Sequence, residues 1–280
     1  MEPTNTRRRL LAGLSAAGTA ALAGCTGSTP FVGRRLAESR TIDPEDAAAI
    51  AITGSAGDLT VTGDDREAIG LEIEKQSSSI RTDLEALELE STRDGDVLEL
   101  QATYDGDTGW FESEPAMDLD VALPEALSVD RLRTGTGQVT VTDVTGDLEA
   151  RSSTGSVEIR DVDGTVTAET STGGIEIEDV AAVGDVTAST GSIEAAVPAI
   201  DGDTVLSAST GSVEVALSPT IDADLEARTG TGSLEIDADG LGLEEYRRED
   251  DRVSAALGEG GPRLRIETST GEVSVSALEE

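Results

Sequence analysis

Five glutamates recur at nearly equal intervals in the second half of the chain, and they are the residues best placed to act together. They are Glu158, Glu176, Glu194, Glu214 and Glu235, separated by 18, 18, 20 and 21 residues. Each lies between two apolar residues, as in Val157-Glu158-Ile159. If the segments stack as parallel strands in register, neighbouring carboxylates come about 4.8 Å apart. Adjacent carboxylates are oxygen ligands suited to calcium or magnesium, so the sequence predicts weak binding of divalent cations along this row.

The same row has a simpler interpretation as a solvated acidic face. Two carboxylates at about 4.8 Å repel by about 0.9 kcal/mol in bulk water, and concentrated salt screens that repulsion. The pattern leaves both interpretations open and favours the screened face. It indicates no catalytic residue and no tightly bound cofactor.

The elements that must position these glutamates are short strands of an internal repeat. Seven Thr-Gly steps each precede an apolar–polar–apolar segment, and they begin at Thr136, Thr154, Thr172, Thr190, Thr210, Thr231 and Thr270. A second alternating pair, such as Leu148 and Ala150, follows in each repeat after a glycine-containing joint. Alternation with period two is typical of strands with one buried face, and one such repeat cannot bury its own face.

The repeat therefore predicts an all-β fold, a β-solenoid of two-strand coils of about 18–21 residues, over residues 131–278. An up-and-down array of antiparallel hairpins is the alternative, but the near-constant repeat length favours the solenoid. Residues 46–130 are β-rich without a clear period, and we expect them to cap one end of the coils. Residues 240–262 interrupt the repeat as an irregular insertion, either a short helix or a hairpin.

Hydroxyl side chains also recur at each turn of the repeat. Ser153-Thr154 and Ser171-Thr172 are two of five Ser-Thr steps that directly precede a glycine. An exposed array of hydroxyls is one interpretation. The favoured one is that these hydroxyls bond to backbone groups at the corners of the coils.

The N-terminal residues are typical of an export signal rather than of the folded domain. Arg7 and Arg8 stand in Thr6-Arg7-Arg8-Arg9-Leu10-Leu11, which is similar to a twin-arginine signal. The apolar run from Leu10 to Ala23 is shorter than the roughly 20 residues that a membrane-spanning helix needs. We therefore expect residues 1–25 to form a signal peptide with its cleavage site.

The end of that signal predicts a lipid anchor. Leu22-Ala23-Gly24-Cys25 resembles a lipobox, and Cys25 is the only cysteine of the chain. We expect Cys25 to carry a lipid that holds the mature protein at the outer face of the cytoplasmic membrane. Residues 26–45 would then be a tether between the lipid and the folded part.

Composition narrows the classes of function. The chain has 57 acidic and 20 basic side chains in 280 residues, no histidine, and a formal charge of -37. So acidic a surface argues against nucleic acid as a partner, and the lack of histidine excludes His-based triads and His-ligated zinc. Lys75 is the only lysine. An acidic, lysine-poor chain is similar to proteins of salt-loving archaea, in which salt screens self-repulsion.

The order of these segments resembles a known family. The run from Met117 to Pro124 leads into the Thr-Gly repeats, and the last repeat follows Gly258-Glu259-Gly260-Gly261. This arrangement is similar to the putative-adhesin family, a set of β-strand-repeat domains of unknown function, over roughly residues 46–278. The resemblance implies a cell-envelope β-solenoid and brings no catalytic residues.

Together these patterns predict a non-enzymatic, lipid-anchored structural or adhesin-like interaction protein of the cell envelope. Its partner would be an envelope polymer or protein that meets the acidic solenoid face. A ligand- or stress-sensing module that works with a membrane partner is the main alternative. A polysaccharide-active enzyme is disfavoured, because coils of about 18 residues leave little room for a substrate groove.

Overall fold

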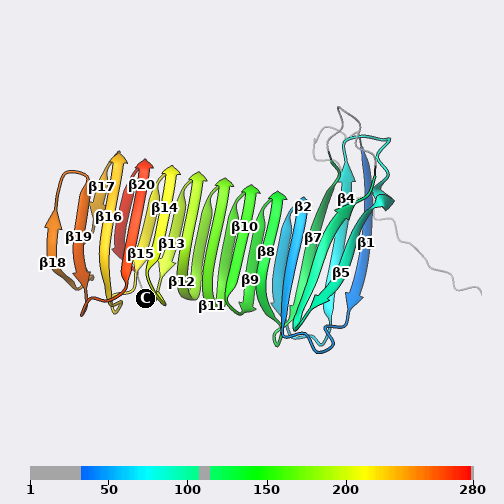
Figure 1. Ribbon diagram of the computed structural model, residues 1–280, viewed down its shortest axis with the longest axis horizontal. Helices are drawn as coiled ribbons and strands as arrows, with labels where there is room; N and C mark the ends of the chain where they lie inside the picture. Colours follow the sequence, from blue (N-terminus) through cyan, green and yellow to red (C-terminus); the bar gives the residue numbers. More distant parts are fainter. Residues whose placement is uncertain (1–32, 107–113, 279–280) are drawn as a thin grey trace, which may run out of the picture. The chain divides into compact units, whose positions relative to one another are not determined.

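The computed structural model describes residues 33–106 and 114–278, which belong to one compact unit. They form stacked coils, each with one strand in each of two facing sheets (Figure 1). A single 3-10 turn, Leu84–Ala86, is the one helical element of the described residues. No helix in those two ranges is long and apolar enough to cross a membrane. The expected β-solenoid is confirmed.

Sheet 1 contains the strands that lead into the Thr-Gly corners, together with further strands at both of its ends. In spatial order its strands are β5 (Leu87–Asp94), β6 (Val97–Tyr104), β2 (Ala49–Ala56), β8 (Ser128–Thr136), β10 (Leu148–Thr154), the second halves of β11 (Val157–Thr172) and β12 (Ile175–Thr190), β14 (Thr204–Thr210), β20 (Arg263–Thr270), β16 (Ala223–Thr231), β19 (Arg252–Leu257) and β18 (Leu243–Arg248).

Sheet 2 holds the strands that follow the corners. In spatial order these are β1 (Arg34–Ile42), β4 (Ile69–Ser77), β7 (Ala116–Pro124), β3 (Leu59–Asp64), β9 (Val139–Thr145), the first halves of β11 and β12, β13 (Ile193–Val197), β15 (Val213–Leu217), β21 (Val273–Ala277) and β17 (Leu234–Ile236). From β7 to β17 every pairing is parallel, which rules out the hairpin array.

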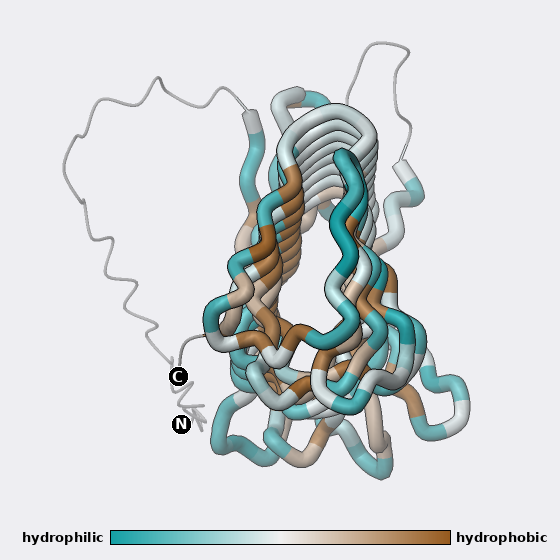
Figure 2. The backbone as a smooth tube through the Cα atoms, turned by 90° about the vertical axis from the view of Figure 1, so that its left-hand side faces the viewer, coloured by the Kyte–Doolittle hydropathy of each residue, from teal (hydrophilic) through white to brown (hydrophobic). Residues whose placement is uncertain are grey.

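The core lies between the two sheets and is built from one aliphatic side chain at every second position. Val157, Ile159, Ile175 and Ile177 are all buried, as the alternation predicted. The intervening Glu158 and Glu176 point outward and are partly covered by their neighbours. Figure 2, which looks along the stack from the β18 end, shows the coils superimposed with their pale corners aligned.

Close approach of the backbones fixes the corner of each coil. Gly155 has φ +144°, and a Cβ at that position would lie 1.9 Å from the carbonyl oxygen of Gly137 in the preceding coil. Gly173 and Gly191 repeat this arrangement one and two coils further on. Only glycine tolerates both the positive φ and the contact, which explains the glycine in each Thr-Gly step of the repeat.

The order of the coils in space differs from their order in the sequence at both ends of the stack. The coil β20–β21 lies between β14–β15 and β16–β17, although it follows both in the chain. Likewise β2–β3 lies between β6–β7 and β8–β9. Figure 1 shows the red β20 between β16 and β14, and the blue β2 beside β8 and β7.

Two expectations about the domain limits need correction, and one open alternative is decided. Arg34–Ile42 is not tether but strand β1, which pairs with β4 along its whole length because its alternate side chains help to cover the core. Within residues 46–130, Ala49–Asp64 forms a regular coil of the stack rather than part of a cap. For the insertion at 240–262, where the sequence left a short helix and a hairpin open, the structure has an antiparallel hairpin, β18–β19, that extends sheet 1 beyond β16.

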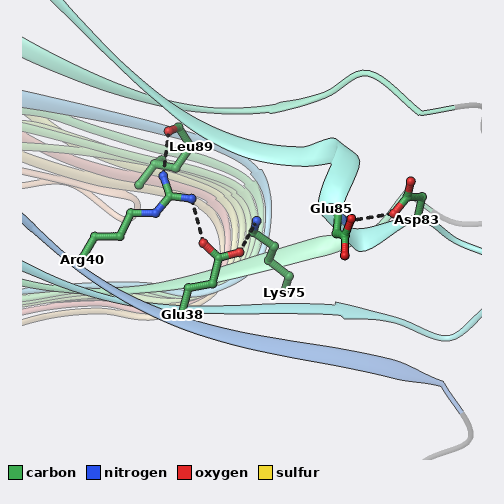
Figure 3. A network of polar contacts seen from close by, with 6 residues as sticks. All are labelled: Glu38, Arg40, Lys75, Asp83, Glu85 and Leu89. Atoms are coloured by element: carbon green, nitrogen blue, oxygen red, sulfur yellow. Dashed lines mark hydrogen bonds and ion pairs between the residues drawn. The ribbon is translucent and has the colours of Figure 1, made fainter. Parts of the chain in front are cut away.

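Arginines link the two sheets where the stack ends. At the N-terminal end Arg40 of β1 donates a 3.4 Å hydrogen bond to the Leu89 carbonyl of β5 (Figure 3). At the other end Arg248 of β18 donates a 2.7 Å hydrogen bond to the Leu234 carbonyl of β17. Each bond joins edge strands of opposite sheets, so it protects part of the exposed edge that a solenoid end presents.

Candidate functional site

The predicted glutamate row forms on the outward side of sheet 2, with one change. Four glutamates are direct neighbours in register, in the order Glu158, Glu176, Glu194 and Glu214. Ser274 of β21 then separates Glu214 from Glu235, so the expected run of five adjacent carboxylates is wrong at its last step. The cause is the inserted coil β20–β21, which puts its own outward residue into the row.

One arginine occupies the first part of the row. Arg160, two residues after Glu158, lies 3.8 Å from Glu158 and 2.9 Å from Glu178, and it also pairs with Glu176. The hydrogen bond with Glu178 and the charge of Glu176 raise the pKa of Arg160 above its usual value. Within the part of the chain that the structure describes, no lysine or arginine forms an ion pair with Glu194 or Glu214.

The row borders a shallow groove rather than a closed site. The groove has a volume of about 180 Å³ and is lined by Glu158, Glu176, Glu194 and the small residues beside them, including Ser156 and Ser192. Across residues 33–106 and 114–278, no group of three or more acidic or cysteine side chains is arranged to hold a metal ion. Cation binding along the row therefore stays a prediction.

The outward side of sheet 1 carries a different distribution of charge. Near β8 and β10, Glu149 lies 2.8 Å from both Arg133 and Arg151. The hydrogen bond from Arg133 lowers the pKa of Glu149, although partial burial opposes the shift. Sheet 1 thus places its arginines among its carboxylates.

A second Arg–Glu group lies further along sheet 1. Arg228 is 2.7 Å from Glu267, and Arg252 is 2.7 Å from Glu226. Arg265 stands 3.9 Å from both of these glutamates. The two faces therefore differ in these regions: the glutamates of the two Arg–Glu groups on sheet 1 are paired, whereas Glu194 and Glu214 on sheet 2 form no ion pair with any residue that the structure describes.

Hydroxyls bond to the backbone at the corners, but not the hydroxyls that the sequence suggested. At five of the seven Thr-Gly steps the bond comes from a buried hydroxyl two positions before the threonine; at the other two steps that position is alanine. The donors are Thr134, Ser152, Thr170, Thr229 and Thr268, and each bonds to the glycine carbonyl of the adjacent coil at 2.9–3.0 Å. The Ser-Thr steps themselves, such as Ser153-Thr154, are exposed.

Several predicted residues lie outside the described ranges. They are the lipidation residue Cys25 and the export-signal residues Arg7 and Arg8.

A family model decides the relationship of this chain to known proteins. The model of the Toastrack domain, DUF4097, matches residues 118–276, which is more than half of the chain. The chain belongs to the Toastrack family. The match begins in β7 and ends in β21, so it includes the glutamate row, both Arg–Glu groups and the inserted coil.

Solved structures similar to this Toastrack chain come from bacteria. A putative cell adhesion protein from Clostridium sporogenes is 12% identical, with a TM-score of 0.38, and the match covers 88% of this chain and 100% of that one. A putative adhesin from Bacteroides fragilis is 14% identical, with a TM-score of 0.39 and coverage of 86% and 97%. A putative lipid binding protein from Parabacteroides distasonis is 15% identical, with a TM-score of 0.36 and coverage of 85% and 96%. None of the curated proteins compared matches the chain.

Sheet 2 also has recesses over the strands that precede most of the Toastrack match, and no pattern in the sequence indicates them. One hollow of about 410 Å³ lies over β1, β4 and β7 and is lined by Arg40, Arg66, Glu72 and Asp120, among others. A second of about 320 Å³ adjoins it beside Asp118. Burial raises the pKa of Asp118, opposed by a 2.9 Å hydrogen bond from the Asp58 backbone N–H. These residues converge only through the long-range pairing of β1 with β4, β4 with β7 and β7 with β3, which no local pattern encodes.

Proposed function

We propose that this Toastrack protein is a lipid-anchored interaction protein of the cell envelope that meets its partner with the outward side of sheet 2. The observation that carries the proposal is the unpaired carboxylate row at Glu194 and Glu214, set on a flat parallel sheet beside the small side chains of Ala196 and Ala216. A rigid row of like charges attracts a basic or cation-coated partner and repels acidic ones. The partner is therefore an envelope polymer or protein with cationic groups, or one bridged by divalent cations.

The proposal assigns no catalysis to this surface. The groove along the row is shallow, and the charged groups beside it are ordinary surface carboxylates and one arginine. A rigid scaffold with an exposed charged face fits binding better than bond-breaking chemistry, which needs groups that converge on one reacting atom. The membrane attachment in this proposal comes from a lipid on Cys25.

The binding claim is tested with a matched pair of variants. The row variant is Glu194→Gln with Glu214→Gln, and the control is Glu90→Gln with Glu244→Gln, two exposed glutamates far from the row that give the same change of net charge. Fractionated envelope polymers and proteins are screened with the parent in molar salt, with and without calcium. The row variant should lose the interaction and the control should keep it. Equal loss in both would mean that net charge, rather than this face, decides binding.

The anchor is tested separately. Replacing Cys25 by serine should release the protein from membranes or leave an unprocessed precursor. Arg7→Lys with Arg8→Lys should block export of the folded protein. Unchanged membrane retention of the serine variant would overturn the lipid anchor but would leave the binding face untouched.

A further inference from the structure

The coil β20–β21 fills an internal slot of the stack. Its strand β20 pairs in parallel with β14 on one side and with β16 on the other. Its strand β21 does the same with β15 and β17. The segment Ser218–Asp222, which joins β15 to β16, passes over this position, so the rest of the chain leaves a gap one coil wide.

Both neighbouring coils are shaped to hold this insert. On the β14 side, the Arg263 N–H donates a 2.9 Å hydrogen bond to Asp203, and Thr268 donates one to the Gly211 carbonyl. On the β16 side, Thr229 donates a 2.9 Å hydrogen bond to the Gly271 carbonyl. Four apolar side chains of the insert are buried in the core between the sheets: Leu264, Ile266, Val273 and Val275.

An empty slot would be costly. Four strands, β14, β15, β16 and β17, would each have an unpaired edge, and the apolar core would be open to water. The slot therefore has to be filled by a coil of this sequence. Every contact just described is made by the coil and its two neighbours, so none of them requires that the coil belong to the same chain.

The described connection to the coil is short and rich in glycine. It runs from Gly258 to Pro262, and Gly258, Gly260 and Gly261 all have positive φ. Because β16 lies between β19 and β20, this connection must cross about two strand spacings, roughly 10 Å. Five residues span at most about 18 Å, so the connection can close back on its own slot or, when extended, reach the slot of an adjacent molecule.

We propose that β20–β21 is exchanged between copies of this protein, so that the coil of one chain fills the slot of a second and the second returns its own coil to the first. Such a reciprocal dimer has the same coil–slot contacts as two monomers, and differs in the connection and in the entropy of association. Protein concentration then selects between the two forms. This inference does not depend on the proposed function.

The test uses full-length chains that carry Cys25→Ser, so that introduced cysteines are the only thiols. Thr210 and Thr270 are exposed neighbours in register across the slot. One chain carries Thr210→Cys and another carries Thr270→Cys; they are mixed, unfolded, refolded together at high concentration in molar salt, and oxidised. Exchange places the two cysteines side by side on different chains and yields a disulfide-linked heterodimer. A chain with both substitutions should form the internal disulfide when refolded dilute.

The matched control is the pair Thr172→Cys and Thr190→Cys, which are neighbours in successive coils of the continuous part of the stack. That pair should give no heterodimer above random surface cross-linking. If the Thr210 and Thr270 variants give no more heterodimer than this control, although the doubly substituted chain cross-links internally, the coil stays in its own chain and the proposal is overturned.

A hinge variant gives an independent readout. Removing Gly260 and Gly261 leaves three residues to cross about 10 Å and to reverse direction, which strains closure within one chain. The variant should therefore shift from monomer to dimer in size-exclusion chromatography with light scattering. A shortened hinge whose melting temperature falls but which stays monomeric even at high concentration would also overturn the exchange.

Discussion

Lys75 Nζ lies 2.7 Å from Glu38 Oε1, and this pair joins β4 to the edge strand β1 at the N-terminal end of the coils (Figure 3). The Lys75 side chain is 3% exposed and is the only lysine of the protein. Arg40 contacts the same carboxylate and also bonds to the Leu89 carbonyl of sheet 1. A buried ammonium needs a partner. Glu38 therefore accepts the hydrogen bond of the buried Lys75 ammonium and, by doing so, attaches β1 to the end of the core.

The stability of this end should depend on pH. Hydrogen bonds from Lys75 and then Arg40 lower the pKa of Glu38 below its usual 4.5. A carboxyl with a lowered folded-state pKa stabilises the fold above its unfolded pKa, and that stabilisation is lost as pH falls through the folded value. Glu38→Gln should lower the free energy of unfolding by about 1–3 kcal/mol at pH 7. The difference from the parent should shrink below pH 4.5.

Denaturant unfolding in molar salt at several pH values checks this. The control adds Lys75→Met to Glu38→Gln, which removes the buried ammonium as well and should recover most of the loss. A loss of equal size at neutral and acid pH would show that Glu38 acts by packing and not by charge.

Two adjacent glycines at one corner should differ sharply in how much an alanine substitution destabilises the fold. Gly173 has φ +144°, and a Cβ there would lie 2.1 Å from the Gly155 carbonyl oxygen. At Gly174 the nearest atom would be the Ser192 carbonyl oxygen at 3.5 Å, and the equivalent position in the next coil is Ser192 itself. Gly173→Ala should destabilise by about 2–5 kcal/mol, and Gly174→Ala should change stability by no more than about 0.5 kcal/mol. Thermal unfolding of the two variants tests this prediction. A similar loss of stability in both would contradict the close approach of Gly173 to the preceding coil.

The buried hydroxyls at the corners predict one loss and one gain. Thr170 is 1% exposed and donates a 3.0 Å hydrogen bond to the Gly155 carbonyl. Thr170→Val keeps the shape but removes the donor, and should cost about 1–2 kcal/mol. In the next coil the equivalent residue is Ala188, which has no hydroxyl. Ala188→Ser should add the missing bond to the Gly173 carbonyl and stabilise by about 1 kcal/mol. A Ser variant less stable than the parent would show that this corner is too tightly packed for an oxygen atom.

The repeat pattern was sufficient to predict the structure of one coil but not the order in which the coils stack. Alternation placed Ile175 inside and Glu176 outside, because the two faces of a strand differ at every second residue. The same alternation could not predict which strands β21 pairs with. Gly271-Glu272-Val273 has the same form as the other corners, so nothing in its own residues says which neighbours it takes. The long interval before Thr270 marked an irregular insertion at 240–262 but did not show that the last coil lies between two earlier ones.

The contacts that close the ends of the stack could not be predicted from the sequence either. Glu38 and Lys75 are 37 positions apart on antiparallel strands, and a lone lysine among many acidic residues reads as an ordinary surface charge. Its partner follows only from the register of β1 against β4, in which Glu38 lies opposite Ile73. Long-range registers of this kind depend on the whole sheet and not on any local pattern.

Salt should stabilise the fold, and part of the effect should come from the glutamate row. The Debye length is about 3 Å at 1 M salt and about 10 Å at 0.1 M, so carboxylates about 4.8 Å apart are screened only in concentrated salt. Glu194→Gln with Glu214→Gln removes the two unpaired members of the row. We expect unfolding free energy to fall as sodium chloride drops from 3 M towards 0.1 M, and to fall less in this variant than in the Glu90→Gln, Glu244→Gln control.

The same variants separate a screened face from a cation-binding one. If the row binds divalent cations, millimolar calcium at low salt should raise the melting temperature of the parent and of the control, but not that of the row variant. Arg160→Gln should strengthen the calcium effect, because it frees Glu158 and Glu176 from their ion pairs. Calcium that raises all of these melting temperatures equally acts through general screening, and the row is then a solvated face. A parent equally stable at 0.1 M and 3 M salt would remove the link between the acidic surface and a saline environment.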